Sequence, residues 1–343
     1  MKKQILNVLR KREMLLFLII VVLSIFVQSR APSFLTYENI SNVLKACSIV
    51  GIFSLGVLVV TISGGFDVSF VAIAQVSEYL VVWLLIRYVQ GNLVVAFAMA
   101  IVVGTLMGLF NGFLIDHYKM PAIIITISTQ NLFYGILYVV TGGLSLYAVP
   151  QYLAPLANHK IFGAVAANGA IYGISTVTVL WFALAIIVGL FLRYTISGRS
   201  IYLMGGNSIA AERIGINITK STLMVYGIGG AIAGIAAIAH ISVIMTVIPN
   251  SIVGSEMDTI AAVILGGASI TGGVGSVVGT ILGVILFALI NNSLTLLQIS
   301  SSWYNVFIGG IILASIIINA LQLKQQFKRK VRVKVEESGK KND

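Results

Sequence analysis

The feature that most constrains this chain is a series of apolar runs, each long enough to cross a lipid bilayer. A spanning helix needs about 20 mostly apolar residues, and such runs recur along most of the 343 residues. Hydrophobic residues make up 58% of the chain and charged residues 10%, whereas a soluble protein carries about 25% charged residues. Too few polar side chains remain to cover a surface in water. The chain is therefore predicted to be an all-α polytopic membrane protein.

Polar and glycine-rich breaks divide the apolar sequence into about ten predicted spans. They are expected near residues 14–29, 43–62, 68–88, 92–115, 121–141, 174–194, 221–243, 257–271, 276–297 and 303–321. The first span follows a basic stretch and could be a signal peptide, but no A-x-A cleavage site follows it, so we expect it to be uncleaved. These spans form one transmembrane domain over residues 14–321.

The placement of the 22 basic residues predicts the orientation. An even number of spans puts both termini on one side. If that side is the cytoplasm, eighteen Lys and Arg lie inside and four lie outside, as the positive-inside bias requires. The basic segments 1–13 and 322–343 and the loop 196–220 are then cytoplasmic. Anionic lipid is an expected partner of the tail, whereas nucleic acid is not, because no recognition module accompanies the charge.

The longest segment between spans, residues 142–173, is then extracytoplasmic. It contains aromatic residues, Pro and Gly and carries almost no charge. Two interpretations stay open: a short interfacial helix or docking surface, or a loop lying on the lipid headgroups.

Neither a catalytic site nor a metal site is predicted. Cys47 is the only cysteine, and His117, His159 and His240 lie on separate segments without metal-ligand spacing. The pattern G-x-x-x-x-G-K-[ST] does not occur, so ATP is not expected to bind this chain. Polar side chains within spans either join helices or line a polar path. They are Gln75, Glu78, Asn111, Gln130, Asn131, Asn291, Asn292 and Gln298.

Three regions interrupt the apolar pattern, and the first is SGGFDVS at residues 63–69. Gly64 and Gly65 weaken a helix, and Asp67 is costly near lipid unless it meets water, a cation or backbone donors. The segment is expected to be either a broken helix lining a water-filled cavity or a tight turn at the membrane surface with a solvated Asp67.

The second region, LGGASITGGVGSVVG at residues 265–279, is predicted to be a glycine-rich turn between two closely packed spans. It begins with a glycine pair, as the first region does, which hints at an internal repeat of the kind found in transporters. A separate motif, G-x-x-x-G at Gly230 and Gly234, predicts close helix packing.

The third region, YLMGGNSIAAERIGINI at residues 202–218, is predicted to contain a short cytoplasmic helix. Asn207 can cap its start, and Gly215 is suited to the left-handed conformation that ends a helix. A helix of about two turns is marginal alone. Ala210 and Ala211 have small side chains that allow close contact with another surface. We therefore expect a protein partner there rather than lipid.

At these regions the sequence resembles the permease subunits of bacterial ATP-binding-cassette (ABC) importers for ribose, related sugars and autoinducer-2. The stretch GGFDVSFV is similar to the family pattern G-G-I-D-L-S-V-G, and PAIIITIS is similar to its Pro followed by a T-L-G-like stretch. Residues Glu256 to Gly275 match a third family pattern almost throughout. The fourth pattern, G-R…G-G-N-x-x-A-A-x-x-x-G-I, matches Gly198, Arg199, Gly205, Gly206, Asn207, Ala210, Ala211, Gly215 and Ile216.

The resemblance covers nearly the whole chain and implies a transport function. It implies a homo- or heterodimer of permeases, a cytoplasmic ATPase dimer that holds ATP and Mg, and an extracytoplasmic substrate-binding protein. It assigns contact with the ATPase to Gly205, Gly206, Asn207, Ala210, Ala211, Glu212, Arg213 and Gly215. We expect the translocation path near Gly64, Gly65, Asp67, Ser69, Thr126, Gln130, Asn131, Gly266, Gly267 and Ser269.

The chain departs from the family pattern at two positions near that path. Val71 and Ser128 stand where the family usually has Gly, which leaves the identity of the solute open. The leading hypothesis is the permease subunit of an ABC importer for a small sugar-like solute, with ATP hydrolysed by another subunit. The alternative is a secondary transporter driven by an ion gradient. It would need buried carboxylates, for which Asp67 and Glu78 are the candidates.

Overall fold

The computed structural model describes residues 12–88, 91–165, 171–300, 302–310 and 313, and this part is mainly helical. It contains eight helices long and apolar enough to span a membrane. They are α2 (Arg12–Arg30), α3 (Tyr37–Ile62), α4 (Phe70–Arg87), α5 (Leu93–Tyr118), α6 (Ala122–Thr141), α8 (Thr176–Tyr194), α11 (Ile218–Ile244) and α13 (Val277–Leu296). The all-α class is confirmed, and eight of the predicted spans are helices.

The other two predicted spans have different outcomes. Only α12 (Ser255–Leu265) is helical in the span expected at 257–271. Its 11 residues are about 16 Å long, half the thickness of the hydrocarbon core. The prediction of a full-length helix there is wrong, because Gly267 takes a φ of +97° directly after the last helical turn. Residues 302–310 are helical, but most of the tenth span and the terminal segments 1–11 and 314–343 lie outside the described residues.

Half of the eight spanning helices begin at a side chain that caps them. The side-chain oxygens of Thr36, Asn92, Asn217 and Ser276 each accept a hydrogen bond from the backbone N–H three residues further on. The first turn of a helix has no internal partner for its N–H groups, and in lipid no water replaces one. Short polar residues at the breaks therefore determine where these helices start.

The closest helix pair in the core is α5 with α11. A Cβ on Gly230 would lie 3.0 Å from Gly108 Cα and would overlap the carbonyl group of Gly104, and Gly234 lies equally close to Ala100. Only backbones without side chains can approach so closely. The packing role predicted for the G-x-x-x-G motif is confirmed.

The predicted loop 142–173 is folded at one end of the bundle, which we call the hairpin end. It contains η1 (Gln151–Leu153), α7 (Pro155–Asn158) and the antiparallel strands β1 (Lys160–Val165) and β2 (Ile171–Ser175). Tyr37 Oη donates to the Phe162 carbonyl at 2.9 Å, which ties this hairpin to the start of α3. Burial, with the nearby charge of Lys45, lowers the pKa of Lys160. The hairpin itself was not predicted.

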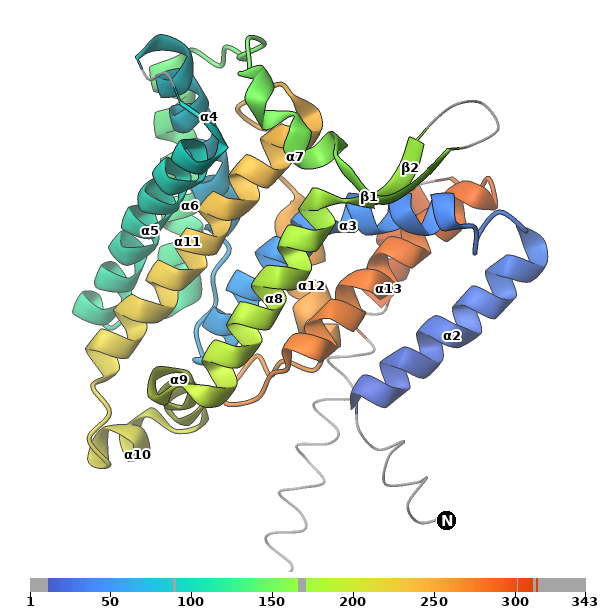
Figure 1. The fold of residues 1–343 in the computed structure, drawn as a ribbon. Helices are drawn as coiled ribbons and strands as arrows, with labels where there is room; N and C mark the ends of the chain where they lie inside the picture. The colour runs from blue at the N-terminus through green and yellow to red at the C-terminus, as the bar shows by residue number, and fades with distance from the viewer. Residues whose placement is uncertain (1–11, 89–90, 166–170, 301, 311–312, 314–343) are drawn as a thin grey trace, which may run out of the picture.

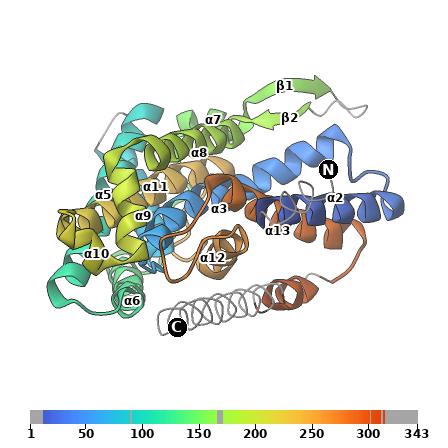
Figure 2. The ribbon, with the colours of Figure 1, turned by 90° about the horizontal axis from the view of Figure 1, so that it is seen from below.

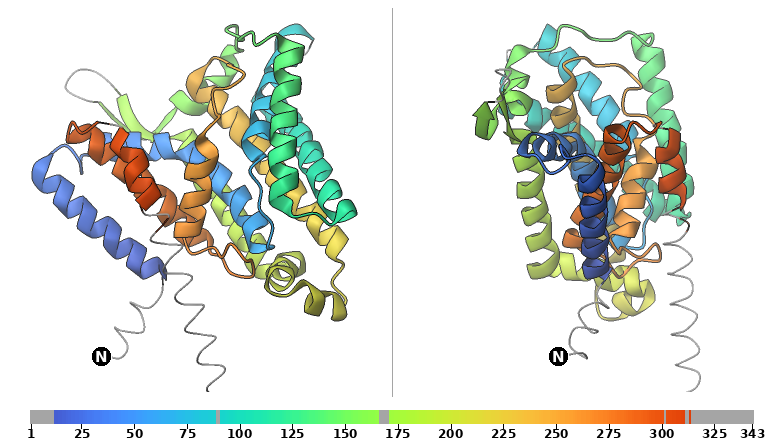
Figure 3. Two further views of the ribbon diagram at one scale, coloured as in Figure 1. Left: turned by 180° about the vertical axis from the view of Figure 1, so that it is seen from behind. Right: turned by 90° about the vertical axis from the view of Figure 1, so that its right-hand side faces the viewer.

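The opposite end of the bundle carries α9 (Ile196–Gly206) and α10 (Ser208–Arg213), and we call it the α10 end. Figure 1 shows the two ends at the top and the bottom of the molecule. In Figure 3, α2 stands on the side of the bundle away from α5 and α6. Glu13, near the start of α2, accepts a hydrogen bond from Ser276, so this outlying helix is joined to the start of α13.

Candidate functional site

The α10 end is built from two short helices joined at a single residue. Thr195 caps α9 through a bond from Gly198 N (2.9 Å), and Asn207 Oδ1 caps α10 through a bond from Ala210 N (3.0 Å). Gly215 follows α10 with a φ of +91°. The predicted cap and the predicted left-handed glycine are both confirmed, whereas the 11-residue helix α9 was not expected. Figure 2 shows α9 and α10 from below.

Of the two neighbouring alanines in α10, only one is available to a partner. Ala211 is 2% exposed, because α10 packs back on α9 and α11 with this side chain inward. Ala210, Glu212 and Arg213 are exposed, and Ile209 and Ile214 are 65% and 69% exposed. Of the two alanines expected to contact a partner, only Ala210 is exposed, and the two isoleucines are exposed beside it.

The end of α9 meets two glycine turns that are distant in sequence, and we call this meeting point the glycine junction: Gly64, Gly205, Gly272 and Gly273. A Cβ on Gly205 would lie 2.7 Å from Gly273 N, and one on Gly272 would lie 2.6 Å from Gly64 Cα. Gly273 N donates to the Ile62 carbonyl at 2.8 Å. The backbone of α9 therefore touches both the break after α3 and the turn before α13.

The junction borders a cavity of about 460 Å³ at the α10 end. Its lining includes Gly64, Gly65, Gly206, Asn207 and Thr271. A side chain of α9 adds a second link, since Tyr202 Oη donates to the Gly275 carbonyl at 3.0 Å. A displacement of α9 must therefore either move the turns at Gly64 and Gly272 with it or break their contacts with α9.

The polar residues of the first region are buried and bonded to one another. Asp67 is 4% exposed, and its Oδ1 accepts from Ser69 N (2.8 Å) and Ser69 Oγ (2.6 Å). Asn111 Nδ2 donates to Ser69 Oγ at 2.7 Å, and Thr126 Oγ1 donates to the Phe66 carbonyl. The interpretation with a solvated Asp67 is wrong, because its carboxylate finds its donors within the protein. Residues 63–69 form a non-helical break between α3 and α4, and a water-filled cavity along this break stays a prediction.

The remaining residues expected near the path lie in different surroundings. Gln130 Nε2 donates to Glu256 Oε1 at 2.7 Å and so joins α6 to α12, whereas Asn131 is exposed and bonds its own helix. Gly266 packs against Gly279, and Ser269 bonds Thr271. The structure thus brings Gly64 to the α9 glycines but leaves Asn131 apart. The role of these residues in a path stays a prediction.

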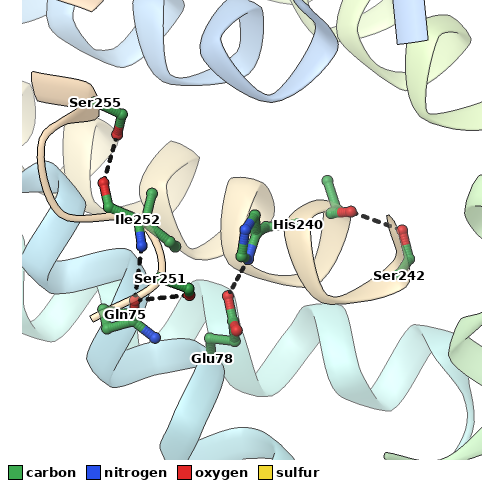
Figure 4. A network of polar contacts seen from close by, with 8 residues as sticks. Gln75, Glu78, His240, Ser242, Ser251, Ile252 and Ser255 are labelled. Atoms are coloured by element: carbon green, nitrogen blue, oxygen red, sulfur yellow. Dashed lines mark hydrogen bonds and ion pairs between the residues drawn. The ribbon is translucent and has the colours of Figure 1, made fainter. Parts of the chain in front are cut away.

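A second polar cluster joins α4 to the segment around α11 and α12 (Figure 4). His240 Nδ1 lies 2.8 Å from Glu78 Oε2. Gln75 Oε1 accepts from Ser251 Oγ at 3.2 Å and from Ile252 N at 3.3 Å. Glu78 Oε1 and Gln75 Nε2 are buried without a partner among the described residues. Gln75 and Glu78 were candidates from the sequence, but their partners were not, because 162 or more residues separate them.

Asn42 and Asp258 were not predicted as site residues, although both line cavities of this protein. Asn42 lies one residue before the start of a predicted span, and Asp258 lies at the start of another. Polar residues are common at the membrane surface, so neither position indicated a site. A polar residue at a span boundary is the only signal that could have found them. Among the described residues, no group of three or more His, Cys, Asp or Glu could hold a metal ion.

A multi-pass helical bundle with an apolar core, buried polar clusters and a short exposed helix at one end is typical of a membrane transport protein. The profile of one family, described as the permease component of branched-chain amino acid transport systems, matches residues 39–316. This match covers most of the chain, which therefore belongs to that family. No solved structure matches it significantly.

Curated relatives resemble the chain over nearly its full length. The ribose import permease protein RbsC of Bacillus subtilis is 33% identical, with 89% of this chain and 90% of the relative covered. RbsC of Escherichia coli K12 is 30% identical, with 88% and 91% covered. The autoinducer 2 import system permease protein LsrC of Salmonella typhi is 30% identical, with 94% and 89% covered.

These similarities identify the chain as the permease subunit of an ABC importer, a multi-pass protein of the bacterial inner membrane. Such a permease works with an ATPase, which hydrolyses ATP, and with a substrate-binding protein. The chain itself is not an enzyme. The ion-gradient-driven transporter is not supported, and Asp67 and Glu78, the carboxylates it would need, are engaged by Ser69 and His240.

Proposed function

We propose that this permease imports a small sugar or sugar-like solute: ribose, a related monosaccharide or autoinducer-2. The observation that carries the proposal is the similarity, over about nine tenths of both chains, to permeases named for ribose and autoinducer-2 import. A permease chain of this kind does not hydrolyse ATP, so it does not supply the energy for transport. ATP and Mg therefore belong to the partner ATPase, and no cofactor is assigned to this chain.

In the assembly that we propose, two permease chains, identical or related, stand on a cytoplasmic ATPase dimer. The α10 end is proposed to face the cytoplasm, because the predicted orientation puts eighteen of the 22 basic residues on that side. The hairpin end then receives the extracytoplasmic binding protein. Lipid surrounds the spans and contacts the basic tail.

The ATPase is proposed to dock on α10 and to act through the glycine junction. Ile209, Ala210 and Ile214 offer it a small exposed apolar surface, beside the charges of Glu212 and Arg213. Because Ala211 packs inward on α9 and α11, force applied to α10 passes to α9. Gly205 then transmits it to the turns at Gly64 and Gly272.

Reconstituted transport tests the proposed function. Proteoliposomes containing the permease and its ATPase, with the binding protein added outside, should accumulate radiolabelled D-ribose only when ATP is present inside. Vesicles without ATPase but with an imposed proton or sodium gradient are the control. Uptake driven by the gradient alone would contradict the importer mechanism. ATP-dependent uptake that excludes D-ribose, related monosaccharides and autoinducer-2 would contradict the solute class.

A further inference from the structure

Two cavities run side by side along α3 and share four lining residues. The first, about 580 Å³, lies toward α11 and the start of α12, and the second, about 450 Å³, lies toward α13. Asn42, Ala46, Val50 and Asp258 line both. Since the shared residues form a common wall, we treat the two cavities as one feature, the α3 groove.

The wall of the groove is mainly apolar, but it carries polar side chains although it lies between membrane helices. Polar side chains there come from several separate elements: Asn42, Lys45, His240, Ser251, Ser255, Asp258, Asn291, Asn292 and Tyr304. Polar and ionisable groups inside a bilayer are costly and face a cavity or a partner. Among the described residues, neither Lys45 nor Asp258 takes part in an ion pair. Asp258 accepts a hydrogen bond from Tyr304 Oη at 3.3 Å. The free-energy cost of placing these two charges in lipid indicates a groove that holds water or a polar solute.

Buried residues behind the groove fix the side chains that line it. Glu78 is fully buried and holds His240 Nδ1, while the imidazole, 13% exposed, forms part of the wall. With Nδ1 engaged, Nε2 is the ring nitrogen left for a ligand. Gln75 holds Ser251 and Ile252, two further wall residues, in the same way. Figure 4 shows both supports on α4, directed at the chain around α11 and α12.

We propose that the α3 groove binds the transported solute, a neutral polyhydroxylated molecule, and that His240 contacts it directly. Glu78 and Gln75 are positioning residues. The wall offers both hydrogen-bond donors and acceptors, as a polyol requires. Lys45 and Asp258 carry opposite charges, so together they give no net attraction to a charged ligand of either sign. A lobe of 580 Å³ falls within the size range of small-molecule sites. The choice of a sugar rests on the proposed function.

Cysteine accessibility tests the groove without reference to the solute. In a Cys47→Ser background, Ala46→Cys puts one thiol in the groove wall, and Val102→Cys puts one on an exposed apolar face of α5. Each position is nine residues after the first residue of its helix. The thiolate is the reacting species and needs water. Burial in an apolar environment raises the pKa of a thiol by about two units or more, and each unit lowers the thiolate fraction tenfold. A charged methanethiosulfonate should therefore modify Ala46→Cys faster, by roughly 100-fold.

Equal rates at the two positions would show that lipid or a second copy of the chain fills the groove, and would overturn the proposal. D-ribose-loaded binding protein should slow the reaction at Ala46→Cys and leave Val102→Cys unchanged. Absence of this protection in a complex that imports D-ribose would likewise overturn it.

Transport stoichiometry tests His240. The variant His240→Gln keeps an amide to pair with Glu78 and removes the ring nitrogen, and Ser242→Ala is a buried control two residues away whose hydroxyl bonds its own helix. D-ribose imported per ATP hydrolysed should fall roughly tenfold in His240→Gln, the effect of losing one hydrogen bond to the solute. It should stay at the wild-type value in Ser242→Ala.

Equal stoichiometry in the two variants would refute the contact at His240. Glu78→Gln should give a smaller loss, because an amide still supports the ring, and wild-type stoichiometry there would refute its positioning role. If the wild-type complex imports neither D-ribose, nor a related monosaccharide, nor autoinducer-2, the proposed function fails instead. The accessibility of Ala46→Cys then still decides whether the groove is an aqueous site.

Discussion

Replacing Gly205 by Ala should uncouple the ATPase from the permease, because a methyl group there has no space. Its Cβ would lie 2.7 Å from Gly273 N and 2.9 Å from Ser63 C, and it would overlap the Ile62 carbonyl oxygen. All three atoms are backbone, on two different segments, so no side-chain rotation relieves the clash. Gly206 is the matched control, since a Cβ there meets nothing within 4 Å.

The change in the free energy of unfolding is the sum of two opposing contributions. Ordinary contacts of a Cβ begin at about 3.4 Å, so α9 must lift away from the glycine junction. Overpacking of this kind costs about 1–3 kcal/mol. Replacing Gly by Ala within a helix stabilises the folded state by at most about 1 kcal/mol. Gly205→Ala should therefore destabilise the permease by about 1–2 kcal/mol, whereas Gly206→Ala should be neutral or slightly stabilising.

Two measurements on the reconstituted complex separate folding from coupling. The apparent melting temperature of the permease in detergent reports the packing change. The increase in ATPase activity caused by loaded binding protein reports the coupling. We expect Gly205→Ala to lower the melting temperature by a few degrees and to lose most of that stimulation. Basal ATPase activity should be unaffected, because the ATP site lies on another subunit.

The reasoning fails if Gly205→Ala and Gly206→Ala behave alike in both measurements. It also fails if Gly205→Ala lowers the melting temperature but keeps full stimulation, because the junction would then serve packing alone. A loss of coupling in Gly206→Ala, which changes no internal contact, would instead locate the ATPase contact at that residue.

Further predictions concern the caps, the core and one interhelical tether. Asn207→Ala removes the cap of α10, at a cost of about 1 kcal/mol, and should weaken co-purification with the ATPase; unchanged binding would exclude a folded α10 as the contact. Gly230→Val should prevent close packing of α5 on α11 and abolish recovery of folded protein, whereas Gly229→Ala, which faces only a side chain at 3.3 Å, should be recovered normally. Gln130→Leu leaves the Glu256 carboxylate without its side-chain donor and should lower the melting temperature by a few degrees; no change would show that the tether is dispensable.

Some of the architecture was accessible from sequence because the bilayer leaves few choices. Backbone polar groups in lipid must be satisfied within the segment, so an apolar run of sufficient length is a helix. Eight predicted spans are helices for this reason. The cap at Asn207 and the left-handed Gly215 are local too, since each depends on a residue and its immediate neighbours. The span at 257–271 failed because hydropathy does not register the turn at Gly267.

Sequence alone therefore determined the membrane-spanning class, the spacing of the spans, the capped helix at Asn207 and the family. The tertiary structure determined which residues from distant parts of the sequence are in contact. Gly64, Gly205 and Gly272 form a junction only because three chain segments fold to one point, and His240 lies against Glu78 from 162 residues away. Such contacts depend on how whole helices pack, and packing is set by many side chains together rather than by any local pattern. The α3 groove belongs to this second group.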